Sequence, residues 1–207
     1  MGRVVALVGC FLVAAAVGCN VLSFASPYWV ESFDEFTGNR FVKAGLWEFC
    51  FNDYTFYKDH NGKRYLGCFY IFSDTIRPLW EWLSPPWFIV MQVMVSLSLL
   101  IHVINAIFLT LYVFKLFPKY FNSAVLLGSA AVMLFSLGII FVVLIVFGVK
   151  KEDRQWIPRP DMNFLSWSYG LYCMSGWASL FAALALYKGS READDGTTPY
   201  NYPKVNA

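Results

Sequence analysis

Four long apolar segments constrain this chain more than any other feature. None of them contains Asp, Glu, Lys or Arg, and each is long enough to cross a bilayer. They are Val4 to about Ala25, Trp87–Phe114, Phe121 to about Val149, and Met162–Tyr187. A helix rises about 1.5 Å per residue, so about 20 apolar residues cross a hydrocarbon core of about 30 Å. Because only helices satisfy their backbone hydrogen bonds within one segment there, the pattern predicts a membrane α-helical fold with four spans.

Composition agrees with this class and narrows the possible functions. Hydrophobic residues make up 58% of the chain and charged residues 14%, against about 25% charged residues in soluble domains. The net charge of +2 comes without a Lys/Arg block, so we expect no nucleic acid partner. The chain has two histidines, no C-x-x-C pair and no phosphate-binding loop. We therefore expect no enzyme activity, no catalytic residue, no cofactor and no metal site.

The first apolar segment has an alternative interpretation. Arg3, the apolar run and Ser23-Phe24-Ala25 would also fit a cleavable signal peptide. The apolar core of a signal peptide is about 7–15 residues long, however, and this run is longer. We expect a retained helix, with both termini in the cytoplasm, outer loops at residues 27–86 and 150–161, and a disordered cytoplasmic tail at 188–207.

Basic residues give this orientation mixed support, whereas two cysteines favour it. Lys115 and Lys119 would lie inside, but a second basic cluster at residues 150–159 would lie outside, against the positive-inside rule. Cys50 and Cys68 both fall in the first outer loop, and such a pair persists as a disulfide only in an oxidising compartment. The other three cysteines lie within spans, as expected for small core-filling side chains. The sequence thus predicts an external disulfide.

The first outer loop is rich in aromatic and β-branched residues, interrupted by turn residues at 37–39 and 60–62. This pattern is typical of short antiparallel strands, and we expect a four-stranded sheet. A two-residue turn at Asn61-Gly62 would place Cys68 opposite Thr55 instead of Cys50. The disulfide therefore predicts a longer or bulged connection over residues 54–64.

Several residues around this loop are expected to seat the sheet on the bilayer. Trp29 and Trp47 are expected to anchor it at the membrane interface, where indole rings prefer to lie. Gly45 suits a close backbone approach or a bend at the strand edge. Residues 76–87 place Ile76, Leu79, Trp80 and Leu83 on one face, which favours a short interfacial helix over an irregular loop.

The residues Trp29, Gly45-Leu46-Trp47, Cys50 and Cys68 resemble the W–GLW–C–C motif of claudins. The wider superfamily includes peripheral myelin protein, epithelial membrane proteins and gamma-type channel subunits. The resemblance implies a left-handed four-helix transmembrane bundle with an extracellular antiparallel β-sheet from the first outer loop. Seventeen residues separate the two cysteines, more than is usual in vertebrate claudins, and the chain ends without Tyr-Val. The sequence thus resembles a divergent or invertebrate member.

The resemblance also implies a function. We expect a structural adhesion and barrier protein of epithelial occluding junctions, tight or septate, located in the plasma membrane at lateral cell junctions. It would associate with copies of itself or other claudin-like proteins, within one membrane and across the intercellular gap. The alternatives are an auxiliary subunit of an ion channel or receptor, or an organiser similar to peripheral myelin protein or epithelial membrane proteins. The residues expected to contact partners or line a paracellular path are Glu48, Asp53, Lys63, Arg77, Trp156 and Pro158.

Polar and small residues within the spans are expected to hold the bundle together. His102 and Asn105 lie on one face of the second span, where interhelical hydrogen bonds are a more common role than a relay. Ser175, Ser179 and Ala183 recur at a spacing that lets helices approach closely, as do Ala14 and Gly18. Packing inside the bundle is favoured over sideways association with another copy.

The tail carries two weak partner motifs. Tyr202–Val205 fits a tyrosine-based sorting pattern, and Val205-x-Ala207 is a poor ligand for a PDZ scaffold. Both patterns are short and common by chance. A sorting adaptor or cytoplasmic scaffold is therefore only a weak expectation.

Overall fold

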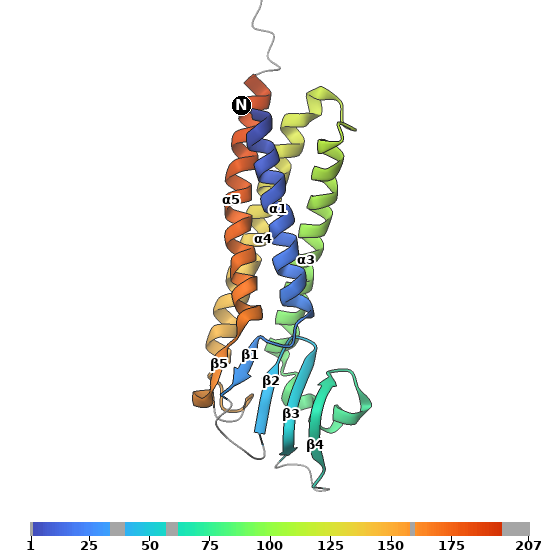
Figure 1. The fold of residues 1–207 in the computed structure, drawn as a ribbon, viewed down its shortest axis with the longest axis vertical. Helices are drawn as coiled ribbons and strands as arrows, with labels where there is room; N and C mark the ends of the chain where they lie inside the picture. The colour runs from blue at the N-terminus through green and yellow to red at the C-terminus, as the bar shows by residue number, and fades with distance from the viewer. Residues whose placement is uncertain (1, 34–39, 57–61, 158–159, 196–207) are drawn as a thin grey trace, which may run out of the picture.

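A computed structural model describes residues 2–33, 40–56, 62–157 and 160–195. Its four long helices lie side by side, with a β-sheet at one end of the bundle (Figure 1). These helices are α1 (Gly2–Ala25), α3 (Pro86–Val113), α4 (Asn122–Lys150) and α5 (Trp167–Asp195). All four are long and apolar enough to cross a membrane. The predicted four-span architecture is confirmed.

The fourth helix differs from its prediction at both ends. It begins at Trp167, not Met162, because residues 160–165 form a 3₁₀ turn, η3 (Pro160–Met162), and a strand, β5 (Asn163–Leu165). It also continues to Asp195, so residues 188–195 of the expected disordered tail are helical. The extension is held by contact with α4, since Ser190 Oγ donates to the carbonyl of Ser123 at 2.9 Å. Residues 196–207, which carry both tail motifs, lie outside the described residues.

The sheet has five strands, not the four expected from the first loop. These are β1 (Val30–Ser32), β2 (Arg40–Ala44), β3 (Glu48–Thr55), β4 (Arg64–Tyr70) and β5, in the order β4-β3-β2-β1-β5. Every pairing is antiparallel, and β1 pairs with β5 through Val30–Leu165 and Ser32–Asn163. The first four strands thus lie between α1 and α3 in the chain, and the segment between α4 and α5 adds the fifth strand at the edge of the sheet.

A short helical link leads from the sheet to α3. It consists of η1 (Asp74–Leu79) and α2 (Trp80–Leu83), so the predicted short helix between these elements is present. Ile76, Leu79 and Leu83 are buried, but Trp80 is 46% exposed. A 3₁₀ helix aligns residues three apart, which places Ile76 and Leu79 on one side and turns Trp80 away from it. The expectation that Trp80 shares their face was wrong.

Each helix buries one stripe and exposes apolar side chains elsewhere. The stripe of α1 recurs every three or four residues, as packing against neighbouring helices requires. Its members are Ala6, Gly9, Val13, Ala16, Asn20 and Ser23. Helices α1 and α5 approach closely near their ends away from the sheet, where a Cβ built on Gly189 would lie 3.1 Å from the Cβ of Ala6. The chain reverses between α3 and α4 through η2 (Lys119–Phe121).

Candidate functional site

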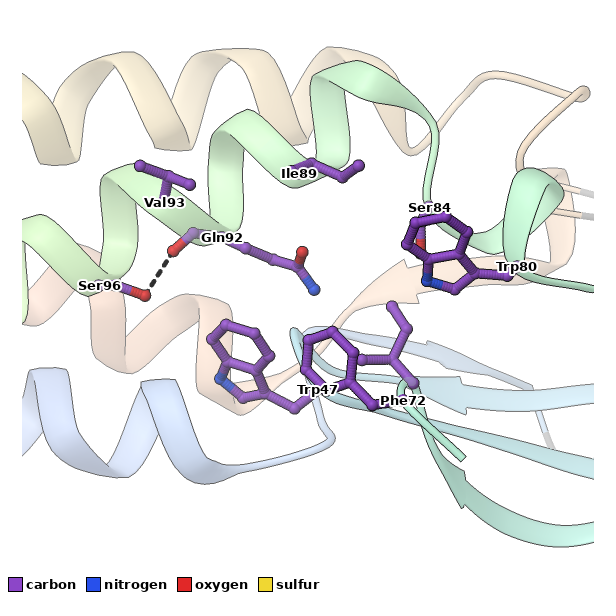
Figure 2. Close-up of a pocket in the computed structure, with 9 residues that line it drawn as sticks. Trp47, Phe72, Trp80, Ser84, Ile89, Gln92, Val93 and Ser96 are labelled. Atoms are coloured by element: carbon purple, nitrogen blue, oxygen red, sulfur yellow. Dashed lines mark hydrogen bonds between the residues drawn. The ribbon is translucent and has the colours of Figure 1, made fainter. Parts of the chain in front are cut away.

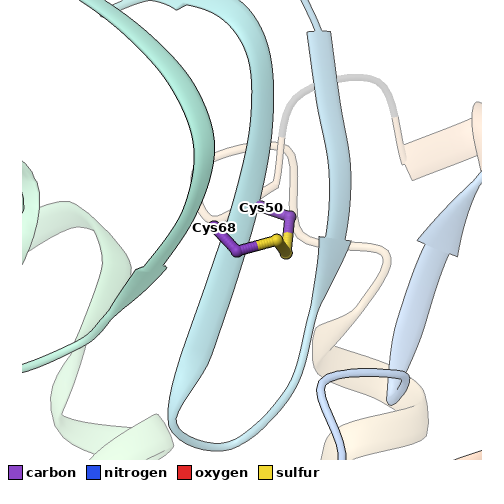
Figure 3. Close-up of a disulfide and its surroundings, with 2 residues drawn as sticks. All are labelled: Cys50 and Cys68. Carbon is purple, nitrogen blue, oxygen red and sulfur yellow. A yellow bond between two sulfur atoms is a disulfide. The ribbon is translucent and has the colours of Figure 1, made fainter.

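The two loop cysteines lie opposite each other on β3 and β4. Cys50 pairs with Cys68 in the strand register, their Cα atoms are 4.0 Å apart, and their sulfurs form a disulfide (Figure 3). A carboxylate oxygen of Glu48 lies within 4.8 Å of both sulfurs. Because the sulfurs are bonded to each other, they offer no thiolate to a metal. The bridge restricts the unfolded states of the loop and so stabilises the sheet.

The strand register explains how the cysteines meet. Phe51 faces Gly67, but the next pair is Tyr54 with Tyr65, so β3 carries one more residue than β4 over this interval. This β-bulge contains Asp53, whose φ of +48° lies in the left-handed region that aspartate tolerates better than most residues. Strand β3 ends at Thr55, and β4 begins at Arg64. The predicted longer connection is confirmed, and residues 57–61 lie outside the described part of the chain.

Gly45 stands where no other residue fits without a backbone shift. A Cβ built there would lie 2.5 Å from the Cα of Pro27 and 2.6 Å from the carbonyl oxygen of Ser26. Both obstacles are main-chain atoms, which cannot rotate away as a side chain can. The Gly45 N–H also donates to the Glu48 carbonyl at 2.8 Å. The expected close backbone approach therefore occurs, and it is directed at the segment that leaves α1.

Trp29 lies inside the protein instead of at its surface. Its side chain is fully buried and its Nε1–H donates to the Ser23 carbonyl at 2.8 Å. The ring packs against Phe147, with centroids 4.9 Å apart, and Tyr172, at 5.4 Å. Since a partner within the chain satisfies the indole N–H, the ring does not need the polar membrane interface. The expectation that Trp29 anchors the sheet in the bilayer was wrong.

Trp156 is a second buried indole and corrects another prediction. It is only 3% exposed, and its centroid lies 4.7 Å from that of Trp87 and 5.2 Å from that of Phe88. Its Nε1–H donates to the Leu83 carbonyl at 3.2 Å. Trp156 was expected to face neighbouring molecules, but it packs the second loop onto the start of α3. The neighbouring candidate, Pro158, lies outside the described residues.

Leu46 and Trp47 complete the attachment of the sheet. The Leu46 side chain is fully buried, and its carbonyl accepts a 2.5 Å hydrogen bond from Gln92 Nε2 on α3. Trp47 is half-buried, with its ring 5.2 Å from that of Phe24 on α1 and 6.2 Å from that of Phe72. The Gly-Leu-Trp tripeptide thus joins the sheet to α1 and α3. The membrane anchoring by Trp47 stays a prediction.

The remaining charged candidates lie along the β3–β4 side of the sheet and on η1. Asp53 accepts from Arg64 at 3.2 Å, an exposed pair whose attraction is weak in water. Lys63 Nζ donates to the Thr75 carbonyl at 3.1 Å, while Arg77 on η1 is exposed. Sequence reasoning did not single out Arg64 as a site residue. Within the described part of the chain, it forms a salt bridge with the predicted site residue Asp53.

A buried hydrogen-bond network joins all four helices in the middle of the bundle. His102 Nε2 lies 2.9 Å from Ser136 Oγ on α4 and 3.1 Å from Ser179 Oγ on α5, and Nδ1 lies 3.2 Å from Asn20 Nδ2 on α1. The predicted interhelical role of His102 is confirmed. Asn105 is buried on the same helix, but its Nδ2 has no partner among the residues described.

Small residues in the spans divide into two groups. Ser175, Ser179 and Ala183 are buried, and Ser175 Oγ donates to the Ala16 carbonyl at 3.0 Å. These residues pack inside the bundle, as expected. Ala14 and Gly18 face outward, and a Cβ built on Gly18 meets no described atom within 4 Å beyond the local backbone of its own helix. The prediction of packing within the bundle is therefore wrong for this second pair, because these two residues lie on a face of α1 outside its buried stripe.

Four membrane-length helices with one small antiparallel sheet, four strands of which lie between the first two helices, define a tetraspan membrane protein. A family model described as PMP-22/EMP/MP20/Claudin tight junction matches residues 5–188, and the chain belongs to this family. Comparison with curated proteins gives no match. Family membership supports a role as a junction component or membrane organiser, association with claudin-like proteins in general, and a non-enzymatic, structural character.

Proposed function

We propose that this protein is an adhesion and barrier component of epithelial occluding junctions, tight or septate. The observation that carries the proposal is the five-stranded sheet, built from both loops at the same end of the bundle (Figure 1). Buried aromatic rings and a disulfide hold it there. Such a sheet keeps a fixed shape with respect to the membrane. Adhesive contacts between neighbouring cells require a surface of this kind.

In this proposal the sheet faces the outside of the cell and both termini lie in the cytoplasm. The Cys50–Cys68 bond supports the orientation, because a structural disulfide persists in an oxidising compartment and is rare in the cytosol. At the opposite end of the bundle lie Lys115 and Lys188, which are exposed. Basic residues close to the ends of spans favour the cytoplasmic side.

The two edges of the sheet support side-by-side association. On the β4 edge, Leu66 and Tyr70 are exposed, and on the β5 edge Phe164 is exposed with its ring 4.9 Å from that of Phe33. Because the two edges carry different side chains, contact of one edge with the other joins copies head to tail. Head-to-tail contacts build open rows, not closed dimers, when the rotation does not close. A continuous row is the arrangement that a barrier along a cell border requires.

The proposal is tested by replacing the protein in an epithelium from which it has been depleted. Leu66 and Leu116 are 69% and 67% exposed, but they lie at opposite ends of the molecule, so Leu66→Lys and Leu116→Lys form a matched pair. We expect depletion to admit a small tracer between cells. Wild-type protein and Leu116→Lys should restore its exclusion, whereas Leu66→Lys should reach the surface without restoring it.

Two results would contradict this function. The first is that the tracer stays excluded after depletion and the junctions keep their normal appearance. The second is that the protein co-purifies with one channel and is absent from lateral borders. The second result would favour an auxiliary channel subunit.

A further inference from the structure

A groove with a volume of about 300 Å³ lies between α1 and α3, in the half of the bundle away from the sheet. We call it the α1–α3 groove. Its α1 wall consists of Cys10 and Ala14, and its α3 wall extends from Ala106 to Phe114. Phe114 is the residue that caps the end of α3. The groove therefore extends from the end of this helix into the membrane-spanning part of the bundle.

The walls of the α1–α3 groove suit an apolar chain. They contain no charged residue, and the one hydroxyl, on Thr110, already donates to the Ala106 carbonyl at 2.7 Å. Residues 106–113 cover about 10 Å along α3. Ala14 and Thr110 are exposed and lie in candidate spans, so the groove opens toward the bilayer. One lipid acyl chain can enter it from the side.

A lysine with an uncommon backbone conformation lies at the end of the groove. Lys115 follows Phe114 and has a φ of +58°. Its N–H donates to the Tyr112 carbonyl at 3.0 Å, and the N–H of Leu116 donates to the Leu111 carbonyl at 3.1 Å. This pair of bonds is a Schellman motif, in which the left-handed position is usually glycine. Because main-chain donors already satisfy these carbonyls, the ammonium of Lys115 is not needed to cap α3.

The surroundings of Lys115 indicate that its partner is a lipid head group. Its neighbours Phe114 and Leu116 are 71% and 67% exposed, which places apolar side chains against the lipid on both sides of it. Lys115 itself is exposed and forms no salt bridge with any described residue. The turn from α3 to α4 carries Lys115 and Lys119 and no acid. A cation at this level attracts lipid phosphate.

We propose that the α1–α3 groove and Lys115 together bind an anionic phospholipid, with one acyl chain between the helices and the phosphate at Lys115. A phosphatidylcholine would bring its cationic choline to a turn that has two lysines and no acid. In the orientation given above this end faces the cytoplasm, where anionic lipids are concentrated. The inference requires four spanning helices and does not depend on a junctional role.

A second groove beside α3, at the sheet end, provides an internal comparison. Figure 2 shows it between Trp47 and Phe72 on one side and Ile89 and Val93 of α3 on the other. Its volume is similar, about 340 Å³, but no charged residue lines it. A lipid that enters this groove therefore meets no cation in its walls that would select the head group.

The experiment uses the full chain in nanodiscs of phosphatidylcholine with a trace of a photoreactive lipid. The two probes are phosphatidylserine and phosphatidylcholine, each with a diazirine on one acyl chain. After illumination, mass spectrometry quantifies labelling of residues 106–114 and, for comparison, residues 84–96. We expect the phosphatidylserine probe to label residues 106–114 about fivefold more strongly than the phosphatidylcholine probe. The two probes should label residues 84–96 equally.

A pair of variants tests the groove. Ala14→Phe fills it, whereas Ala124→Phe places the same ring on an exposed position of α4, outside it. We expect labelling of residues 106–114 by the phosphatidylserine probe to fall about tenfold in Ala14→Phe and to stay at the wild-type level in Ala124→Phe. Equal labelling of the two variants would overturn the groove as the site.

A second pair of variants tests the charge. Lys115→Gly removes the ammonium and suits the left-handed backbone, so the end of α3 is retained. Lys188→Ala, at an exposed lysine of α5 near the same end of the bundle, is the control. We expect Lys115→Gly to lose the preference for phosphatidylserine and Lys188→Ala to keep it. A preference that survives in Lys115→Gly would overturn the anionic lipid as the ligand, and so would equal labelling of residues 106–114 by both probes in the wild type, which needs no variant to fold.

Discussion

The sheet end of the bundle and its opposite half are held together in different ways. At the sheet end the core is an aromatic cluster of Trp29, Phe88, Phe147, Trp156 and Tyr172. In the opposite half the buried residues are mostly small or aliphatic, and include Ala6, Val13, Ala16, Ala182 and Ala183. The His102 network lies between them. One bundle therefore uses large rings at the sheet end and small side chains in the opposite half.

The physical surroundings explain this difference. Near the membrane surface, water makes burial of large apolar rings favourable. Within the hydrocarbon, lipid tails are as apolar as the side chains, so helices associate through close packing and interhelical hydrogen bonds. Close packing requires small residues, as where Gly189 meets Ala6. Substitutions in the aromatic cluster should therefore cost more than substitutions in the network.

The largest effect is expected from Trp29→Ala. It removes a fully buried ring and leaves a cavity beside Phe147 and Tyr172, which costs about 3–5 kcal/mol in the free energy of unfolding. Trp80→Ala, at a half-exposed indole, is the control and should cost less than about 1 kcal/mol. Unfolding in mixed micelles, followed by helical circular dichroism, measures both. Equal losses would show that the aromatic cluster is not the stronger part of the molecule.

Removal of the disulfide should rank next. The double variant Cys50→Ser, Cys68→Ser opens a bridge across 18 residues and should destabilise the sheet by about 3 kcal/mol. Hydrogen exchange should rise in β3 and β4 and stay unchanged in α1 and α4. Cys10→Ser, at a free cysteine in the bundle, provides the control. Equal exchange increases in the sheet and the bundle would mean that the two regions unfold together.

Gly45→Ala tests how closely the sheet is attached to α1. The added methyl group meets the backbone of Ser26 and Pro27, and overpacking of this kind costs about 1–3 kcal/mol. Gly18→Ala places the same methyl group in open space on α1 and should stabilise the helix by about 0.5–1 kcal/mol. Thermal melts of both variants give the comparison. A Gly45→Ala variant as stable as the wild type would contradict the close approach.

His102→Leu should have a smaller effect than these three. It leaves Asn20, Ser136 and Ser179 without their central partner, and interhelical hydrogen bonds in membranes contribute about 0.6–2 kcal/mol. Val103→Leu, on the next residue of α3, controls for the change of side-chain volume. If His102→Leu lost as much stability as Trp29→Ala in the same micelles, the expected ranking of the two regions would be wrong.

The smallest effect concerns Asp153 in the loop after α4. The backbone N–H of Gln155 and the ammonium of Lys150 hold the pKa of this carboxyl below its usual value. A lowered folded pKa stabilises the loop above the ordinary aspartate pKa, and this contribution disappears as the pH falls through the lowered value. Protection of the Gln155 amide against exchange should therefore decrease in acid, and Asp153→Asn should remove that dependence. Identical profiles for the two proteins would contradict this.

Local sequence patterns predicted much of the fold. Hydropathy found the four spans because each is a continuous stretch that a bilayer selects by length and composition alone. The cysteine pair, the turn residues and the strand pattern predicted the antiparallel sheet and its irregular connection. Gly45 was recognised because a glycine beside a strand favours a close approach. Each of these inferences rests on residues near one another in the chain.

The errors share a different cause, which is contact between distant segments. An uncharged stretch at 163–165 was assigned to a helix, but β1, more than 130 residues earlier, offers it hydrogen-bond partners. Trp29 was placed at the membrane interface because indole rings favour interfaces, and Trp156 was expected to contact neighbouring molecules. The carbonyls of Ser23 and Leu83 satisfy their N–H groups inside the protein instead.

Membrane insertion, the number of spans and the possibility of a disulfide follow from residue order alone, because each depends on local polarity and spacing. The fifth strand and the buried tryptophans arise only when the two loops close over the end of the bundle. Their energies come from packing and hydrogen bonds between segments that are far apart in the chain. Those contacts decide which indole is core and which faces the bilayer.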